Sequence, residues 1–329
     1  MSGDGRSTDA AGGAAADEGL LDLHAVRVPA PDIGAEPDGF VVTVDAADRI
    51  HFLDWGQPDS AAAEGGEDDG PATPAVLLIH GLNQTAWAWA PVARRLCRVR
   101  RVVALDLRGH GLSDAPTHGY EPEALAGDAI AVAEAVADAV IIAGHGFGAI
   151  VAAWTAARLG ERCERLVLVD GGWEDVGRDS GMAPDEFLPT IEEPPEILRS
   201  MTTFLADRRG FDPTTWDGDQ ERAARSTVVE VPAGHLVPAV RPHALAGMVE
   251  SLLVYRPLQT LAAVTAPIVA LQAGPDEDGA RAAALGDADG GVRGAGRRPI
   301  RVARFPADGH NLMRYRPAEV AAAILAVDR

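Results

Sequence analysis

Histidine and acidic residues gather in five short clusters, each directly after an apolar segment of the chain. These side chains are the ones that proteins use most often to move protons. Glycine accompanies most of them, and a glycine-containing loop can turn its backbone N–H groups toward a pocket. The clusters therefore predict acid–base and oxyanion chemistry at the ends of the preceding segments. They are His80–Gln84, Asp106–Asp114, Gly144–Gly148, Asp276–Asp278 and Gly309–Asn311.

The segments that position these clusters alternate between two kinds. Short, continuous apolar runs indicate buried strands, and the longer amphipathic stretches between them indicate helices. Such alternation is typical of a parallel sheet with helices on both faces. The expected strands are 75–79, 101–105, 139–143, 165–169, 267–273 and 300–305, the expected helices are 85–96, 122–136, 149–159 and 317–327, and upstream edge strands are expected over 25–29, 39–44 and 50–55.

The alternation stops after Gly172 and resumes only at Pro267. Helix-like stretches punctuated by prolines fill the segment between, over residues 184–191, 195–209 and 242–253. A helical insertion between two strands is a candidate lid over a pocket at the carboxyl ends of the strands. We therefore expect three regions: a disordered tail over 1–24, a core over 25–172 and 259–329, and a helical lid over 173–258.

Composition narrows the classes of function. The 329 residues carry a net charge of −20, which argues against nucleic acid and anionic membranes as partners. All 29 basic residues are arginine, so a Schiff-base lysine and a Walker-type phosphate loop are excluded. Cys97 and Cys163 are isolated thiols that predict neither a disulfide framework nor a metal clip. With no basic, apolar leader at the N-terminus and no apolar run of membrane-spanning length, we expect a cytoplasmic protein.

Four segments, read in order, resemble the landmarks of the α/β-hydrolase fold superfamily. They are HGLNQ at 80–84, DLRGHGLSD at 106–114, GHGFGA at 144–149 and DGHNLMRYRP at 308–317. The resemblance extends from about Arg27 to the C-terminus. It implies a mostly parallel eight-stranded sheet with helices on both faces and a helical lid inserted after the sixth strand.

One position departs from that family's pattern. The nucleophile elbow is G-x-S-x-G, with serine on a strained strand-to-helix turn. Here the five residues are GHGFG, and Gly146 occupies the nucleophile position. Glycine has no side chain with which to attack a carbonyl or hold an acyl group. We therefore expect a vacant nucleophile position and no covalent intermediate at this turn.

The remaining site residues are implied by the resemblance. His310 matches the general base, and the backbone N–H groups of Leu82 and Phe147 match the oxyanion hole. The acid that orients His310 is ambiguous. Counting from the start of the expected strand over 267–273 selects Asp276, and counting from Gly274 at its end selects Glu277. Asp276 is the first choice, Glu277 the second, and Asp170, after the strand over 165–169, the third.

Further residues near the expected strand ends are candidates for binding substrate. Asn83 and Gln84 either orient a polar group of the substrate or brace their own loop. Trp87, Trp89 and Trp173 are candidates for lining an apolar pocket, although core packing explains Trp87 and Trp89 equally well. With other aromatic residues they favour a hydrophobic small molecule. The histidines come from separate loops without the local spacing of metal ligands, so we expect no metal and no cofactor.

These residues support two classes of function. In the first, an enzyme uses His310 as a general base on water to hydrolyse a small hydrophobic ester or lactone. A variant of this class uses the same base for cofactor-free oxygenation or C–C cleavage. In the second, a pseudoenzyme holds a small molecule in a lidded pocket without turnover. The sequence leaves the oligomeric state open.

Overall fold

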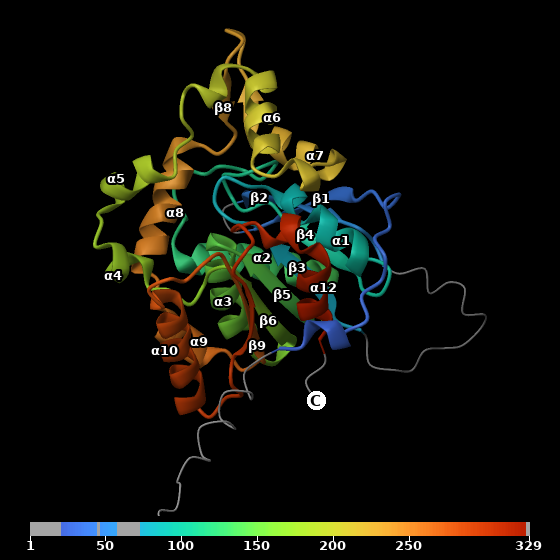
Figure 1. The fold of residues 1–329 in the computed structure, drawn as a ribbon, viewed down its shortest axis with the longest axis vertical. Helices are drawn as coiled ribbons and strands as arrows, with labels where there is room; N and C mark the ends of the chain where they lie inside the picture. Colours follow the sequence, from blue (N-terminus) through green and yellow to red (C-terminus); the bar gives the residue numbers. More distant parts are fainter. Residues whose placement is uncertain (1–20, 45–46, 58–72, 327–329) are drawn as a thin grey trace, which may run out of the picture.

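The computed structural model describes residues 21–44, 47–57 and 73–326. The expected tail therefore lies almost wholly outside the described residues. An eight-stranded sheet forms the centre of the fold, in the order β1-β2-β4-β3-β5-β6-β9-β10 (Figure 1). Its strands are β1 Asp38–Thr43, β2 Arg49–Asp54, β3 Ala75–Ile79, β4 Val102–Leu105, β5 Val140–His145, β6 Cys163–Val169, β9 Ile268–Ala273 and β10 Arg301–Phe305.

Most of the sheet is parallel. Only β2 pairs in the antiparallel sense, with β1 on one side and β4 on the other, and every other pair is parallel. The expected eight-stranded, mostly parallel fold is confirmed. An expected edge strand over 25–29 is wrong, because Leu23–Ala25 forms a 3-10 turn capped by Asp22. Pro29 and Pro31 then lack the N–H groups that a strand would need.

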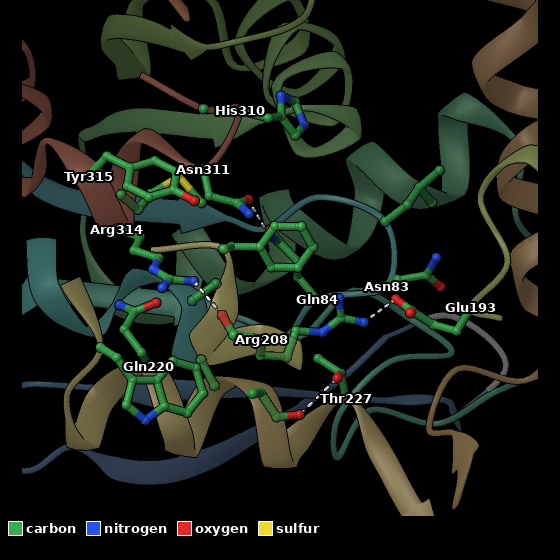
Figure 2. Close-up of a pocket in the computed structure, with 18 residues that line it drawn as sticks. Asn83, Gln84, Glu193, Arg208, Gln220, Thr227, His310, Asn311, Arg314 and Tyr315 are labelled. Carbon is green, nitrogen blue, oxygen red and sulfur yellow. Dashed lines mark hydrogen bonds and ion pairs between the residues drawn. The ribbon is translucent and has the colours of Figure 1, made fainter. Parts of the chain in front are cut away.

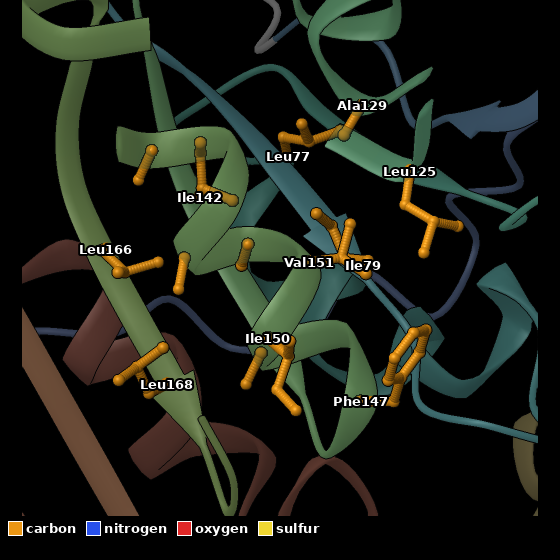
Figure 3. Packing of buried hydrophobic residues seen from close by; sticks show 14 of the residues in the cluster. Leu77, Ile79, Leu125, Ala129, Ile142, Phe147, Ile150, Val151, Leu166 and Leu168 are labelled. Carbon is orange, nitrogen blue, oxygen red and sulfur yellow. The ribbon is translucent and has the colours of Figure 1, made fainter. Parts of the chain in front are cut away.

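Helices cover both faces of the sheet because its strands are apolar on both sides. In β3, Leu77 and Ile79 pack on one core, while Val76 and Leu78 pack on the other. Figure 3 shows the first core, where the strands meet side chains of α2 and α3. The second core is covered by α1 and α12. The helices of these layers are α1 Ala90–Leu96, α2 Pro122–Val136, α3 Phe147–Leu159, α9 Pro257–Ala263, α10 Ala280–Gly294, α11 Leu312–Tyr315 and α12 Pro317–Leu325.

Helix α10 was not expected from the sequence. It carries four glycines, which weaken any helical pattern, and only three of its residues are buried. Its position matters for function, because α10 follows β9 and brings Arg281 toward the ends of the central strands.

Between β6 and β9 the chain leaves the sheet and forms a separate group of elements, drawn at the top and left of Figure 1. A small apolar core joins Phe204, Val228 and Leu236 within this group. Strands β7 and β8 of this group pair as an antiparallel hairpin, which the sequence did not lead us to expect. The helix expected over 195–209 begins only after Ser200, whose hydroxyl caps it. The elements are α4 Val176–Ser180, α5 Pro184–Phe187, α6 Met201–Gly210, α7 Gly218–Ser226, β7 Val228–Glu230, β8 Leu236–Pro238 and α8 Pro242–Val254.

None of the helices in the described part of the chain is long and apolar enough to cross a bilayer. Cys97 and Cys163 are both buried and free.

The turn from β5 into α3 is built from closely packed backbone. A Cβ added at Gly144 would overlap the carbonyl group of Gly148, and one added at Gly148 would overlap the carbonyl oxygens of Ile79 and His80. Any larger residue at either position would therefore push α3 away from the ends of β3 and β5. The two outer glycines of GHGFG are needed for this close approach.

This packing predicts opposite effects for two glycine-to-alanine changes in helices. Gly148→Ala should lower the free energy of unfolding by about 1–3 kcal/mol, because the methyl group overlaps backbone atoms. Gly127→Ala, in α2, should raise it by about 0.5–1 kcal/mol, because nothing lies within 4 Å of the added Cβ and alanine favours the helix. Urea denaturation measures both, and equal effects would contradict this account of the turn.

Candidate active site

His310 and Asp170 form the central contact of the site. His310 follows β10, and its Nδ1 lies 2.6 Å from Oδ2 of Asp170, which directly follows β6. The carboxylate is almost fully buried, whereas 58% of the imidazole is exposed. Burial opposes ionisation of Asp170, but the hydrogen bonds from His310 and from Ala273 N–H, with the charge of Arg281, hold the pKa of the carboxyl below its usual range. An ionised Asp170 therefore fixes the ring and can stabilise its protonated form.

This contact corrects the expectation of Asp276 or Glu277 as the acid. The carboxylate of Asp276 accepts hydrogen bonds from the N–H groups of Arg281 and Ala282, at 3.1 and 2.8 Å, and so caps the first turn of α10. Glu277 is exposed on the same loop. The oxygens of Asp276 are thus used to start a helix, and the carboxylate beside His310 comes from the residue that follows the neighbouring strand β6.

Asp170 is itself held by a positive charge from α10. Arg281 donates from Nη2 to Oδ1 of Asp170 and from Nε to Glu174, each at 2.8 Å. Asp170 also has a φ of 48°, a left-handed conformation that is costly for a residue with a side chain. Sequence reasoning missed Arg281 and Glu174, because no motif marks either residue.

Gly146 faces the free nitrogen of the histidine. Its φ is 54°, which favours glycine, and its N–H donates to the carbonyl of Val169 at 3.0 Å. A Cβ added there would lie 3.2 Å from Nε2 of His310. The backbone of the turn thus keeps the geometry of a nucleophile elbow, while the position that would carry the nucleophile has only hydrogen atoms.

The two backbone groups expected to bind an oxyanion lie on different elements. Phe147 is the first residue of α3, so its N–H has no acceptor in a preceding helical turn. Leu82 lies in the loop after β3, and Gln84 braces that loop by accepting from the N–H of Gly81 at 3.1 Å. Gln84 also donates to Oδ1 of Asn311 at 2.8 Å and so ties this loop to the histidine loop.

The side chains of Asn83 and His145, from two of the sequence motifs, hold loops together. Asn83 donates from its side chain to the carbonyl of Ile191 at 3.1 Å, which joins the β3 loop to the insertion. His145 is buried, with its ring nitrogens 3.0 Å from Oε1 of Gln84 and 3.1 Å from the carbonyl of His310. Burial, reinforced by the neighbouring His310, lowers the pKa of His145 to about 3. His145 therefore stays neutral and supports the turn.

Trp87 and Trp173 line neither of the two cavities that adjoin His310. Trp87 packs edge-on against Trp55, and the guanidinium of Arg222 lies 4.5 Å from the centre of its ring. Trp173 is fully buried and borders a separate cavity of about 320 Å³. Core packing, and not the lining of the site, is thus the role that the structure gives both residues.

Two cavities meet at His310. One, of about 580 Å³, is lined mainly by apolar side chains and includes Gly146, Asp170 and Arg281. The other, of about 490 Å³ and called the polar cavity below, is lined by amides and charged groups from the β3 loop, the insertion and the α11 region, together with apolar side chains such as Phe211, Trp216 and Met313 (Figure 2). A substrate whose reacting atom lies beside His310 can therefore extend into an apolar and a polar compartment. Within the described residues, no three potential metal ligands come together.

The sequence profile of the alpha/beta hydrolase family matches residues 76–323, so the chain belongs to this family. N-formylmaleamate deformylase of Pseudomonas putida is 38% identical over 150 residues, which are 44% of this chain and 53% of that protein. Mouse epoxide hydrolase 4 is 30% identical over 134 residues, 40% of this chain and 34% of that protein. The matched segments span 27 to 53% of the curated relatives.

Solved structures share the fold more completely. The structure of E-2-(acetamidomethylene)succinate hydrolase superposes with a TM-score of 0.68 at 20% identity, over 88% of this chain and 97% of that one. The thioesterase domain from the curacin biosynthetic pathway follows with a TM-score of 0.64 at 20% identity, over 88% of this chain and 99% of that one. At this level of identity, the similarity concerns the fold.

The buried histidines predict an acid-sensitive fold. Burial lowers the pKa of His110, like that of His145, to about 3, whereas the unfolded chain titrates near 6.5. As the pH falls, these two histidines therefore bind protons in the unfolded state before they do so in the folded state. Stability should be constant above about pH 6.5 and fall as the pH drops toward 3, by up to about 1.4 kcal/mol per pH unit for each histidine.

Urea denaturation at about pH 7.5 and about pH 5 measures this loss. His145→Gln should reduce the difference between the two values, and His118→Gln, at an exposed position, should not. Equal stability at both pH values would show that these imidazoles are not buried in their neutral form.

Proposed function

We propose that this chain hydrolyses a small ester or lactone with water activated by His310, without a covalent intermediate. The observation that carries the proposal is the geometry of His310. Its Nδ1 is held by Asp170 at 2.6 Å, and its Nε2 is directed at the space beside Gly146. A water molecule in that space would lie between a base and the substrate carbonyl.

The proposed reaction has two steps. Water attacks the carbonyl carbon while Nε2 of His310 takes its proton, and the N–H groups of Leu82 and Phe147 stabilise the resulting oxyanion. The tetrahedral intermediate then breaks its bond to the leaving oxygen, which receives the proton from the imidazolium. The products are a carboxylic acid and an alcohol, and His310 returns to its neutral form. A positioned base contributes about 10²–10⁴-fold to such a rate.

The insertion over 173–258 is proposed as the lid of this site. Its side chains Glu193, Arg208 and Gln220 border the polar cavity, and Val176 and Phe187 border the apolar one. Both cavities are therefore bounded on one side by the core and on the other by the insertion. Closure of such a lid over His310, whose ring is 58% exposed in this structure, would exclude bulk water from the reacting groups.

A ligand-binding protein without turnover is the second candidate. It is favoured by Gly146, since family members that use an elbow nucleophile need a side chain there. The two candidates differ in one measurable property, because only the enzyme releases product at a rate that depends on His310.

The proposal predicts that variants of His310 and Asp170 lose activity, whereas a variant of Asp276 loses only stability. His310→Gln and Asp170→Asn should each lower kcat/KM for an activated ester by about 10²–10⁴-fold, because one removes the base and the other removes the charge that orients it. Asp276→Asn should leave kcat/KM near the wild-type value and lower the free energy of unfolding by about 1 kcal/mol, because Asp276 caps α10.

Steady-state kinetics of the three variants decides between the candidate acids. A loss of activity in Asp276→Asn that matched the loss in Asp170→Asn would contradict the assignment. Equal rates for wild type and His310→Gln, together with retained ligand binding, would favour the second candidate.

A serine-directed fluorophosphonate probe tests the nucleophile position. The wild-type protein should not be labelled, whereas Gly146→Ser should gain labelling, because its Cβ would lie 3.2 Å from Nε2 of His310. The variant should lose about 1–3 kcal/mol of stability at a φ of 54°. Intact mass spectrometry measures the labelling.

Gly146→Ala is the matched control, since it has the same backbone strain without a hydroxyl group and should stay unlabelled. Labelling of any serine in the wild-type protein would contradict the nucleophile-free account.

A further inference from the structure

The polar cavity beside His310 is bordered by the charged side chains of Glu193, Arg208 and Arg314. The charges of these side chains are balanced by different neighbours. Arg208 forms ion pairs with Glu193 and with Asp207, the latter at 3.2 Å. Figure 2 shows Arg208 and Glu193 joined at the edge of the cavity. Arg208 and Glu193 line the cavity and compensate each other's charge, whereas Asp207 is not among the lining residues.

Arg314, from α11, is compensated differently. Its guanidinium donates to Oγ1 of Thr215 at 2.7 Å, to the carbonyl of Arg208 at 3.1 Å and to the carbonyl of Asp212 at 2.7 Å. All three acceptors are neutral, and among the described residues no ion pair joins Arg314 to a carboxylate. The side chain of Asp212, although nearby, accepts instead from the backbone N–H and the hydroxyl of Thr214.

The guanidinium is held in place without an ion pair to a described carboxylate, although the nearby carboxylate of Asp212 interacts with its charge. It lies 5.7 Å from the ring centre of Trp216 and 5.4 Å from that of Tyr315. Three donated hydrogen bonds leave two of its five N–H groups for another acceptor. A fixed, half-buried cation of this kind is a suitable partner for a carboxylate, which would pair with it at a small cost in side-chain entropy.

The surroundings favour an anion in this cavity and disfavour it in the other. The polar cavity also presents the neutral side chains of Gln220 and Asn83. The apolar cavity is bordered by Asp170, Glu174 and Asp179, with Arg281 already shared by two of these carboxylates. The chain as a whole carries a charge of −20, so an anionic ligand needs a local cation to bind.

We infer that the substrate of this site carries a carboxylate, which binds Arg314 in the polar cavity, while its apolar part occupies the cavity beside Gly146. The inference rests on the proposed function, because it places the reacting carbonyl between the two cavities at His310. It narrows the substrate class to esters or lactones of organic acids that retain a free carboxylate.

Binding of two matched probes tests the inference without turnover. The probes are 4-oxopentanoate and its uncharged amide, 4-oxopentanamide, neither of which contains an ester. By NMR titration, the wild-type protein should bind the carboxylate about tenfold or more tightly than the amide, as expected for a hydrogen-bonded ion pair. Arg314→Gln should abolish this preference.

Arg314 also joins α11 to the insertion, so Arg314→Gln could lose its preference through misfolding. A second pair of variants tests the inference without removing Arg314. Gln220→Glu adds a negative charge within the cavity and should abolish or reverse the preference. Gln259→Glu makes the same change on α9, outside the cavity, and should keep the preference.

Equal binding of the two probes to the wild-type protein would overturn the inference, as would a preference that survives in Gln220→Glu. The outcome is separable from that of the proposed function. Hydrolysis without a preference for the carboxylate would contradict only the substrate class, and a preference without hydrolysis would contradict only the catalytic proposal.

Discussion

The close approach of backbone at the turn between β5 and α3 is the constraint on which the site depends. Gly144 and Gly148 leave no room for side chains, and a Cβ at Gly171 would lie 2.8 Å from the carbonyl oxygen of Gly146. Three segments therefore meet at one point: the end of β5, the start of α3 and the residues after β6. This packing places the backbone of Gly146 beside His310 and starts α3 at Phe147, and it does so without any contribution from a nucleophile.

Near this turn, charged side chains form a chain of contacts that runs from His310 through Asp170 and Arg281 to Glu174. Asp170 is buried and receives hydrogen bonds from His310 on one oxygen and from Arg281 on the other. Arg281 is balanced in turn by Glu174, which also borders the apolar cavity. The side of the site facing the insertion carries the opposite arrangement, with Arg314 bonded only to neutral acceptors. His310 thus lies between the apolar cavity, which Asp170 and Glu174 border, and the polar cavity, which Arg314 borders.

Much of the fold could be predicted from the sequence because its signals are local. Apolar runs such as Ala75–Ile79 alternate with amphipathic helices, and this alternation defines a parallel sheet. Local signals failed where propensity and structure differ. Helix α10 is rich in glycine, and the segment over 25–29 contains apolar residues but ends at Pro29.

The site was predictable only in part, for a physical reason. Motifs give the order of the strand-end loops, but not which carboxylate lies beside His310. The strand order places β6 between β5 and β9, so Asp170 lies nearer the turn at Gly146 than the residues that follow β9. Asp276 has the chemistry of an acid partner, but its oxygens are used to cap α10. Arg281 and Arg314 belong to no local pattern, and only the folded chain brings them to the site.

Pre-steady-state hydrolysis of an activated ester, quenched with acid and analysed by intact protein mass, tests the central claim most directly. If His310 activates water beside Gly146, alcohol will form linearly from the first turnover and the mass of the protein will not change. A burst of alcohol equal to the protein concentration, with the mass of the acyl group added to the chain, would contradict the account.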